Sequence, residues 1–148
     1  MRIALAADHA GYQLKDELSA WLRDAGHEVI DLGTNAPESV DYPEFGARLA
    51  DAVARGEAER GVVVCGSGIG ISIAVNRNPA CRCARVSEPL SAALAREHND
   101  ANVLAIGSRL TGSDMAKACV EAFLGTDFAG GRHQRRVDQL SKLLQESD

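Results

Sequence analysis

The sequence alternates along its whole length between short runs of β-favouring apolar residues and segments with apolar residues at helical spacing. In the first helical segment, Leu14, Leu18 and Leu22 recur every four residues, which places them on one face of a helix. Such alternation is typical of βα units with parallel strands. It predicts strands at residues 2–7, 28–32, 61–65, 83–86 and 103–106, and helices at residues 12–24, 43–55, 69–76, 90–97, 115–124 and 133–144.

The predicted fold class is therefore α/β. We expect a three-layer α/β/α sandwich with a Rossmann-like, five-stranded parallel sheet, extended by a polar C-terminal helix. No linker, repeat or low-complexity stretch divides the 148 residues, which predicts a single domain over residues 1–148. A core of this size needs neither metal nor disulfides to fold.

Charge and hydropathy narrow the range of partners. Sixteen Lys and Arg residues against 21 Asp and Glu residues give a net charge of −5, the wrong sign for a general nucleic-acid binder. No apolar run approaches the ~20 residues of a membrane span, and Met1 and Arg2 lead directly into a strand pattern without a signal sequence. We expect a cytoplasmic protein that binds neither nucleic acid nor a membrane.

The four cysteines do not have the spacing of a metal site. They form no Cys-x-x-Cys pair, and Cys81 and Cys83 lack a second ligand pair at zinc-finger spacing. A cytoplasmic cysteine is usually a reduced, buried apolar residue, and this interpretation suits Cys81, Cys83 and Cys119. It suits Cys65 poorly, because Cys65 ends a strand directly before a glycine-rich loop.

Polar residues gather after the predicted strands. In parallel α/β sheets, ligands bind beyond the carboxyl ends of the strands. A cap or a turn would account for each polar residue alone, but their coincidence at one edge predicts a site. The residues are Asp8 and His9 after the first strand, Asp41 and Tyr42 after the second, residues 65–70 (CGSGIG) after the third and residues 107–109 (GSR) after the fifth.

The loop at residues 66–70 has three glycines, so its backbone N–H groups can turn toward an anion at the start of a helix. It differs from the common anion-binding and nucleophile loops. It has no Gly-Lys pair of a Walker A loop, and Ile71 stands where a dinucleotide loop has Gly and a C-x₅-R phosphatase loop has Arg. Ser67 lacks the two flanking glycines of a nucleophile elbow, G-x-S-x-G. Glu88 follows the glycine loop at nearly the sequence separation of an acid that binds a ribose, which keeps a nucleotide-binding module as an alternative.

Cys65 in this setting predicts proton transfer. Backbone N–H groups and a helix N-terminus favour a thiolate over a thiol, and a thiolate is a general base at neutral pH. The adjacent N–H groups could hold an oxyanion, so the pair predicts proton abstraction next to a carbonyl. The basic segment at residues 132–136 (RHQRR) would bind a phosphate or carboxylate of the substrate; the alternative is a solvated helix start.

These residues carry a resemblance to a known family. The chain resembles the type B ribose-5-phosphate isomerases, a family that includes the galactose-6-phosphate isomerase subunits, and the similarity runs nearly from end to end. The motifs are residues 7–11 (ADHAG), 41–43 (DYP), 65–72 (CGSGIGIS), 87–89 (SEP), 97–104 (EHNDANVL), 107–109 (GSR) and 130–137 (GGRHQRRV).

The resemblance implies an aldose–ketose isomerase of the non-oxidative pentose phosphate pathway. It would interconvert D-ribose 5-phosphate and D-ribulose 5-phosphate through a cis-enediolate, without metal or cofactor. It also implies a homodimer with composite sites, or a dimer of such dimers. The implied roles are Cys65 as base, His98 as ring-opening acid, Ser67 and the Gly66, Gly68, Ile69 and Gly70 amides as enediolate donors, Asp8, His9, Tyr42 and Asn99 as sugar contacts, and Arg109, Arg132 and Arg136 as phosphate ligands.

Two positions depart from the family pattern. Many relatives carry Thr where this chain has Ser67, and both residues have the hydroxyl. Some relatives carry a Glu base at the position of Ile71, which leaves Cys65 without a rival here. Two alternatives remain: an isomerase of a six-carbon sugar phosphate such as allose 6-phosphate or galactose 6-phosphate, and a non-catalytic subunit that only binds a phosphosugar.

Overall fold

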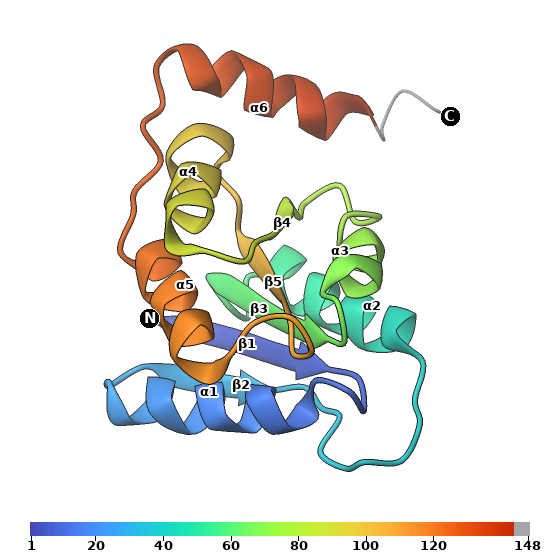
Figure 1. Ribbon diagram of the computed structural model, residues 1–148. Helices are drawn as coiled ribbons and strands as arrows, with labels where there is room; N and C mark the ends of the chain where they lie inside the picture. The colour runs from blue at the N-terminus through green and yellow to red at the C-terminus, as the bar shows by residue number, and fades with distance from the viewer. Residues whose placement is uncertain (144–148) are drawn as a thin grey trace.

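A single sheet of five parallel strands forms the centre of the computed structural model, which describes residues 1–143. The strand order is β2-β1-β3-β5-β4 (Figure 1). The strands are β1 (Arg2–Ala7), β2 (Glu28–Asp31), β3 (Arg60–Cys65), β4 (Cys83–Arg85) and β5 (Val103–Gly107). The predicted fold class is confirmed.

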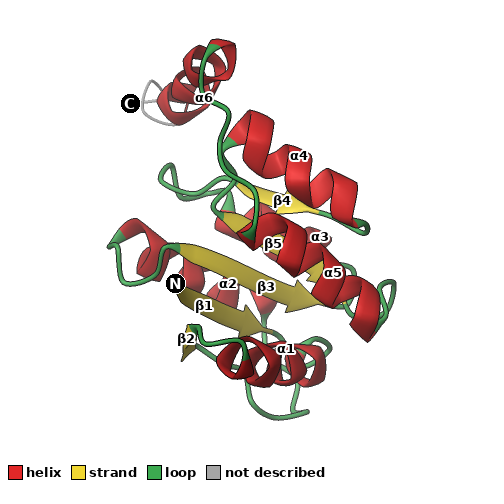
Figure 2. Ribbon diagram, turned by 90° about the vertical axis from the view of Figure 1, so that its left-hand side faces the viewer, coloured by secondary structure: helices red, strands yellow, loops and turns green. Residues whose placement is uncertain are grey.

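Helices cover both faces of the sheet (Figure 2). The helices are α1 (Tyr12–Asp24), α2 (Tyr42–Ala54), α3 (Ile69–Val75), α4 (Pro89–Asn99), α5 (Ser113–Leu124) and α6 (Arg132–Leu143). Buried residues of α1, α4 and α5 share one apolar cluster, and those of α2 and α3 share the other. The sheet therefore lies between two helical layers, as the α/β/α prediction requires.

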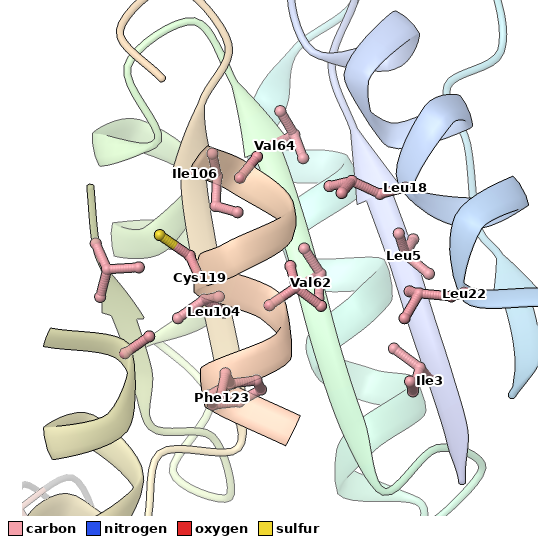
Figure 3. Packing of buried hydrophobic residues seen from close by; sticks show 14 of the residues in the cluster. Ile3, Leu5, Leu18, Leu22, Val62, Val64, Leu104, Ile106, Cys119 and Phe123 are labelled. Carbon is pink, nitrogen blue, oxygen red and sulfur yellow. The ribbon is translucent and has the colours of Figure 1, made fainter. Parts of the chain in front are cut away.

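The two clusters follow from the period of a β-strand. Alternate residues of a strand point to opposite faces of the sheet, so in β1 Ile3 and Leu5 pack with Leu18 of α1 (Figure 3), whereas Ala4 and Ala6 pack in the cluster of α2. Strands buried on both faces consist of nearly continuous apolar residues, which explains why their positions were evident in the sequence.

Every predicted element is present, with its ends shifted by at most two residues. For example, α4 begins at Pro89 because the Glu88 carboxylate accepts the Ser91 N–H at 3.0 Å and caps the helix. The last helix runs to Leu143, and residue 144, its predicted end, lies outside the described residues. None of the helices within residues 1–143 is long and apolar enough to cross a membrane.

The C-terminal helix α6 lies against α4 and away from the sheet (Figures 1 and 2). Of its residues 132–143, Val137 alone is buried. Leu140 and Leu143 are 48% and 66% exposed. The helix thus extends the sandwich, as predicted, and its own chain covers little of its surface.

A buried ion pair joins α1 to the end of β2. The Lys15 side chain is fully buried, and its Nζ lies 2.8 Å from Oδ1 of Asp31 and 3.0 Å from Oδ1 of Asp16. It also donates to the Asn35 side chain. A buried ammonium requires such partners, because an unpaired charge in the interior is costly.

We expect the Lys15→Ala variant to lose about 3 kcal/mol or more of the free energy of unfolding, since Asp31 loses its cation and the buried stem leaves a cavity. Urea unfolding followed by circular dichroism measures the change. Lys117→Ala is the matched control, because Lys117 Nζ pairs with Glu17 at 3.2 Å on the surface and should contribute less than about 1 kcal/mol. Equal losses in the two variants would contradict the importance of the buried pair.

Candidate active site

A pocket of about 330 Å³ lies at the carboxyl edge of the sheet, where four loops converge as the sequence predicts. Its size falls within the range of small-molecule sites. The lining residues are Asp8, His9 and Ala10 after β1, Tyr42 at the start of α2, Cys65, Gly66, Ser67 and Gly70 around the β3–α3 loop, and Arg109 and Leu110 after β5.

Cys65 is the last residue of β3 and is 4% exposed. The Gly68 N–H donates to its Sγ at 3.2 Å. Gly68 has φ +76°, and a Cβ there would lie 2.8 Å from the Ile106 carbonyl carbon, so only glycine permits this turn of the chain. A backbone donor that points at the sulfur is complementary to a thiolate.

The N–H groups of the β3–α3 loop divide into two sets. The Gly68 N–H is bound to Cys65 Sγ, and the Ile69 N–H donates to Ser67 Oγ at 3.1 Å. Among residues 1–143, no acceptor occurs for the N–H groups of Gly66, Ser67 and Gly70. The sequence predicts all five amides as donors to the substrate, and this stays a prediction. Those of Gly68 and Ile69 have acceptors inside the loop, and the other three are free to bind an anion.

Two side chains lie directly against the glycines of this loop. At Gly70 a Cβ would come within 2.7 Å of the Tyr42 ring, and at Gly66 it would lie 3.2 Å from Arg109 Nη1. The absence of a Cβ therefore lets a phenol and a guanidinium approach the loop backbone. Arg109 brings a permanent positive charge to the pocket.

Asp8 and His9 are held by backbone N–H groups. Asp8 Oδ1 accepts from Ala10 at 3.0 Å and from Gly11 at 3.1 Å, so Asp8 forms a turn and also lines the pocket. His9 Nδ1 accepts the Val40 N–H at 3.1 Å. An accepting Nδ1 carries no proton, so the neutral ring has its proton on Nε2, where it is a donor.

Ser108 joins two of the loops and was not among the predicted site residues. Its Oγ donates to the Ala10 carbonyl at 2.7 Å, and its N–H donates to the Cys65 carbonyl at 2.9 Å. Its place in the motif at residues 107–109 was the available signal. Ala10 and Leu110 also line the pocket, and their apolar side chains gave no chemical signal.

Residues 3–140 match the protein family described as Ribose/Galactose Isomerase. The chain belongs to this family. The ribose-5-phosphate isomerase B of Escherichia coli K12 is 49% identical over 144 residues, which are 97% of each chain.

Two solved structures extend the similarity to the fold. The ribose-5-phosphate isomerase B of Clostridium thermocellum has a TM-score of 0.98 and 47% identity, with complete coverage of both chains. The type B ribose 5-phosphate isomerase of Trypanosoma cruzi has a TM-score of 0.94 and 39% identity over 99% of each chain. The family assignment thus rests on the whole domain as well as on the site motifs.

Of the predicted site residues, Gly68 and Ile69 belong to the β3–α3 loop but do not line the pocket, and four others lie away from it. Helix α4 connects the carboxyl end of β4 to the beginning of β5, so its last residues lie near the opposite edge of the sheet. His98 and Asn99 are there, with Arg132 and Arg136 at the start of α6. Within residues 1–143, the structure does not bring them to the Cys65 pocket.

These four residues, together with His133, are called the second cluster. The rings of His98 and His133 stack with their centroids 4.5 Å apart. Burial lowers the pKa of His133, and the neighbouring His98, Arg132 and Arg136 lower it further. The two guanidinium groups give the cluster a permanent positive charge, which suits an anionic ligand.

The other three cysteines lie in surroundings that disfavour the thiolate. Cys119 is fully buried in the core. Burial raises the pKa of Cys81 to about 11 and also raises the pKa of Cys83 and of Cys119. Among residues 1–143, no group of three or more His, Cys, Asp or Glu residues could hold a metal ion.

Proposed function

We propose that the protein interconverts D-ribose 5-phosphate and D-ribulose 5-phosphate through a cis-enediolate. The observation that carries the proposal is the pairing of Cys65 Sγ with the Gly68 N–H beside the free N–H groups of Gly66, Ser67 and Gly70. A thiol base next to oxyanion donors suits proton abstraction beside a carbonyl. The relatives named above carry the same activity in their names.

In this mechanism the Cys65 thiolate removes the proton from C2 of the open-chain aldose. The electron pair forms the C1–C2 double bond, and the negative charge moves to the C1 oxygen, where the N–H donors stabilise it. The same thiol then returns the proton to C1, and the hydroxyl proton on the C2 oxygen moves to the C1 oxygen, which gives the C2 ketone and the C1 hydroxyl of the ketose. Asp8 and His9 would contact the sugar hydroxyls, and Tyr42 would border the pocket.

The second cluster completes the site if two chains associate. His98 would protonate the ring oxygen to open the furanose, Asn99 would hold a hydroxyl, and Arg132 and Arg136 would bind the phosphate. Because these residues lie at the opposite edge of their own sheet, we propose a two-fold homodimer in which each chain supplies them to its partner. The sparsely covered surface of α6 supports this arrangement.

The Arg136→Ala variant should show a raised KM and a weaker affinity for inorganic phosphate, equivalent to roughly 2–4 kcal/mol for a charge-assisted contact. Turnover at saturation should change less, because the proton-transfer groups are untouched. Steady-state kinetics and phosphate inhibition measure both effects. Arg135→Ala is the matched control, because Arg135 is the exposed neighbour of Arg136 in α6. An unchanged KM for Arg136→Ala would instead support the alternative that this segment is a solvated helix start.

The family description names both ribose and galactose, so a six-carbon sugar phosphate is the second candidate substrate. Steady-state kinetics with ribose 5-phosphate, allose 6-phosphate and galactose 6-phosphate separate the candidates, with and without a chelator. We expect the highest kcat/KM for ribose 5-phosphate and no effect of the chelator. Turnover of none of the three sugars would instead support a non-catalytic phosphosugar-binding subunit.

A further inference from the structure

We propose that Arg85 is a positioning residue that orients the hydrogen bond to the Cys65 sulfur from the far side of one peptide group. Arg85 is the last residue of β4 and is half-buried. Its guanidinium reaches the β3–α3 loop, where Nε donates to the Ser67 carbonyl at 3.0 Å. The inference rests on the proposed function only in taking Cys65 as the base.

The Ser67 carbonyl and the Gly68 N–H are the two ends of the same peptide group. In a trans peptide these groups point in opposite directions within one rigid plane. One end accepts from Arg85, and the other donates to Cys65 Sγ at 3.2 Å. Whatever fixes the direction of the carbonyl therefore also fixes the direction of the N–H toward the sulfur.

Two glycines make this orientation possible. Gly68 adopts the left-handed region, with φ +76°, and a Cβ at Gly107 would lie 2.6 Å from the carbonyl carbon and oxygen of Ser67. The glycines allow the peptide to take this position, but neither donates to it. Arg85 supplies the attraction, because a cationic donor forms a stronger hydrogen bond than a neutral one.

The cation also acts on the strength of the donor. A charge-assisted bond to the carbonyl polarises the amide, and hydrogen bonds in a chain strengthen one another. The Gly68 N–H then holds the thiolate more firmly. Arg85 does not itself line the pocket; the titratable or charged groups that do so beside Cys65 are Asp8, His9, Tyr42 and Arg109, and all four are retained in the test below.

The test measures alkylation of Cys65 by iodoacetamide as a function of pH, read by peptide mass spectrometry. In Arg85→Met we expect the rate at pH 7 to fall about five- to tenfold, the effect of one hydrogen bond, and the whole profile to move to higher pH. Cys81, Cys83 and Cys119 have a raised pKa, so below about pH 9 they are mostly protonated and should react slowly with iodoacetamide.

Arg82→Met is the matched control. Arg82 lies three residues earlier, and its Nε also donates to a backbone carbonyl, that of Asp100, at 2.9 Å. Its loss removes the same kind of bond without touching the loop, so its alkylation profile should match the unsubstituted protein. Arg85→Lys, which keeps the cation without the planar donor, should recover part of the reactivity.

Kinetics provide an independent readout. We expect kcat of Arg85→Met to fall by a similar factor while KM for ribose 5-phosphate stays within about twofold, because the phosphate contacts remain. A folded Arg85→Met variant with an unchanged alkylation profile would overturn the proposal. Arg85 would then only stabilise the contact between β4 and the loop. If the methionine variant does not fold, Arg85→Gln serves the same test. If Cys65→Ala stays active while Arg85→Met shifts the profile, the base assignment fails and the positioning role stands.

Discussion

Replacing Cys65 with alanine should lower kcat by about three to four orders of magnitude, the contribution of a well-placed general base. The change removes Sγ, which is the acceptor of the Gly68 N–H, and leaves the other pocket residues in place. Binding of inorganic phosphate should be nearly unaffected. Exchange of the C2 proton of ribose 5-phosphate with solvent, followed by NMR, should disappear together with turnover.

Cys83→Ala is the matched control for this prediction, since Cys83 is a partly buried thiol on the edge strand. That variant should keep both turnover and solvent exchange. Near wild-type exchange in Cys65→Ala would show that another group moves the proton, and the N–H groups around the sulfur would then serve only the fold of the loop.

Mixing inactive Cys65→Ala and His98→Asn dimers should restore activity, provided that subunits exchange. In a heterodimer of the two variants, one composite site lacks both groups, while the other combines an intact Cys65 with an intact His98 from the opposite chain. Random pairing makes about half of the dimers heterodimers, each with one working site of two. The recovered activity should therefore approach about a quarter of the unsubstituted value.

The control for this experiment mixes Cys65→Ala with the double variant that carries both substitutions in one chain. No pairing of those chains contains an intact Cys65, so activity should stay at the background. Native mass spectrometry verifies that heterodimers form. If they form and activity does not return, His98 acts within its own chain and the composite arrangement is wrong.

The strands and the loops around the pocket could be predicted from the sequence because their signals are local. A strand buried on both faces is a continuous apolar run, and the residues after it lie at a known edge of the sheet. The position of His98 could also be predicted, since a helix of that length carries its last turn across the sheet. The catalytic roles of the site residues and the dimerisation stay predictions, and the variants and the subunit mixing described above test them.

Contacts that depend on the third dimension were not evident. The sequence shows five N–H groups in the glycine loop, but only the fold reveals that Cys65 Sγ and Ser67 Oγ occupy two of them. The link between Arg85 and Ser67 spans 18 residues, and that between Ser108 and Ala10 spans 98. Pairing patterns of residues far apart in the chain are set by packing, for which a single sequence holds no periodic signal.

The sides on which the helices leave the sheet have a consequence for how substrate preference can change. β3 leads into α3 on one face, whereas its neighbours β1 and β5 lead into α1 and α5 on the other. The connecting loops therefore diverge, and Cys65 lines the pocket between them. Under the proposed function, the base is thus fixed to a core strand, while surface loops would set the length of sugar that fits. Substitutions in those loops would then adapt the pocket to a longer or shorter ligand without disturbing the proposed base.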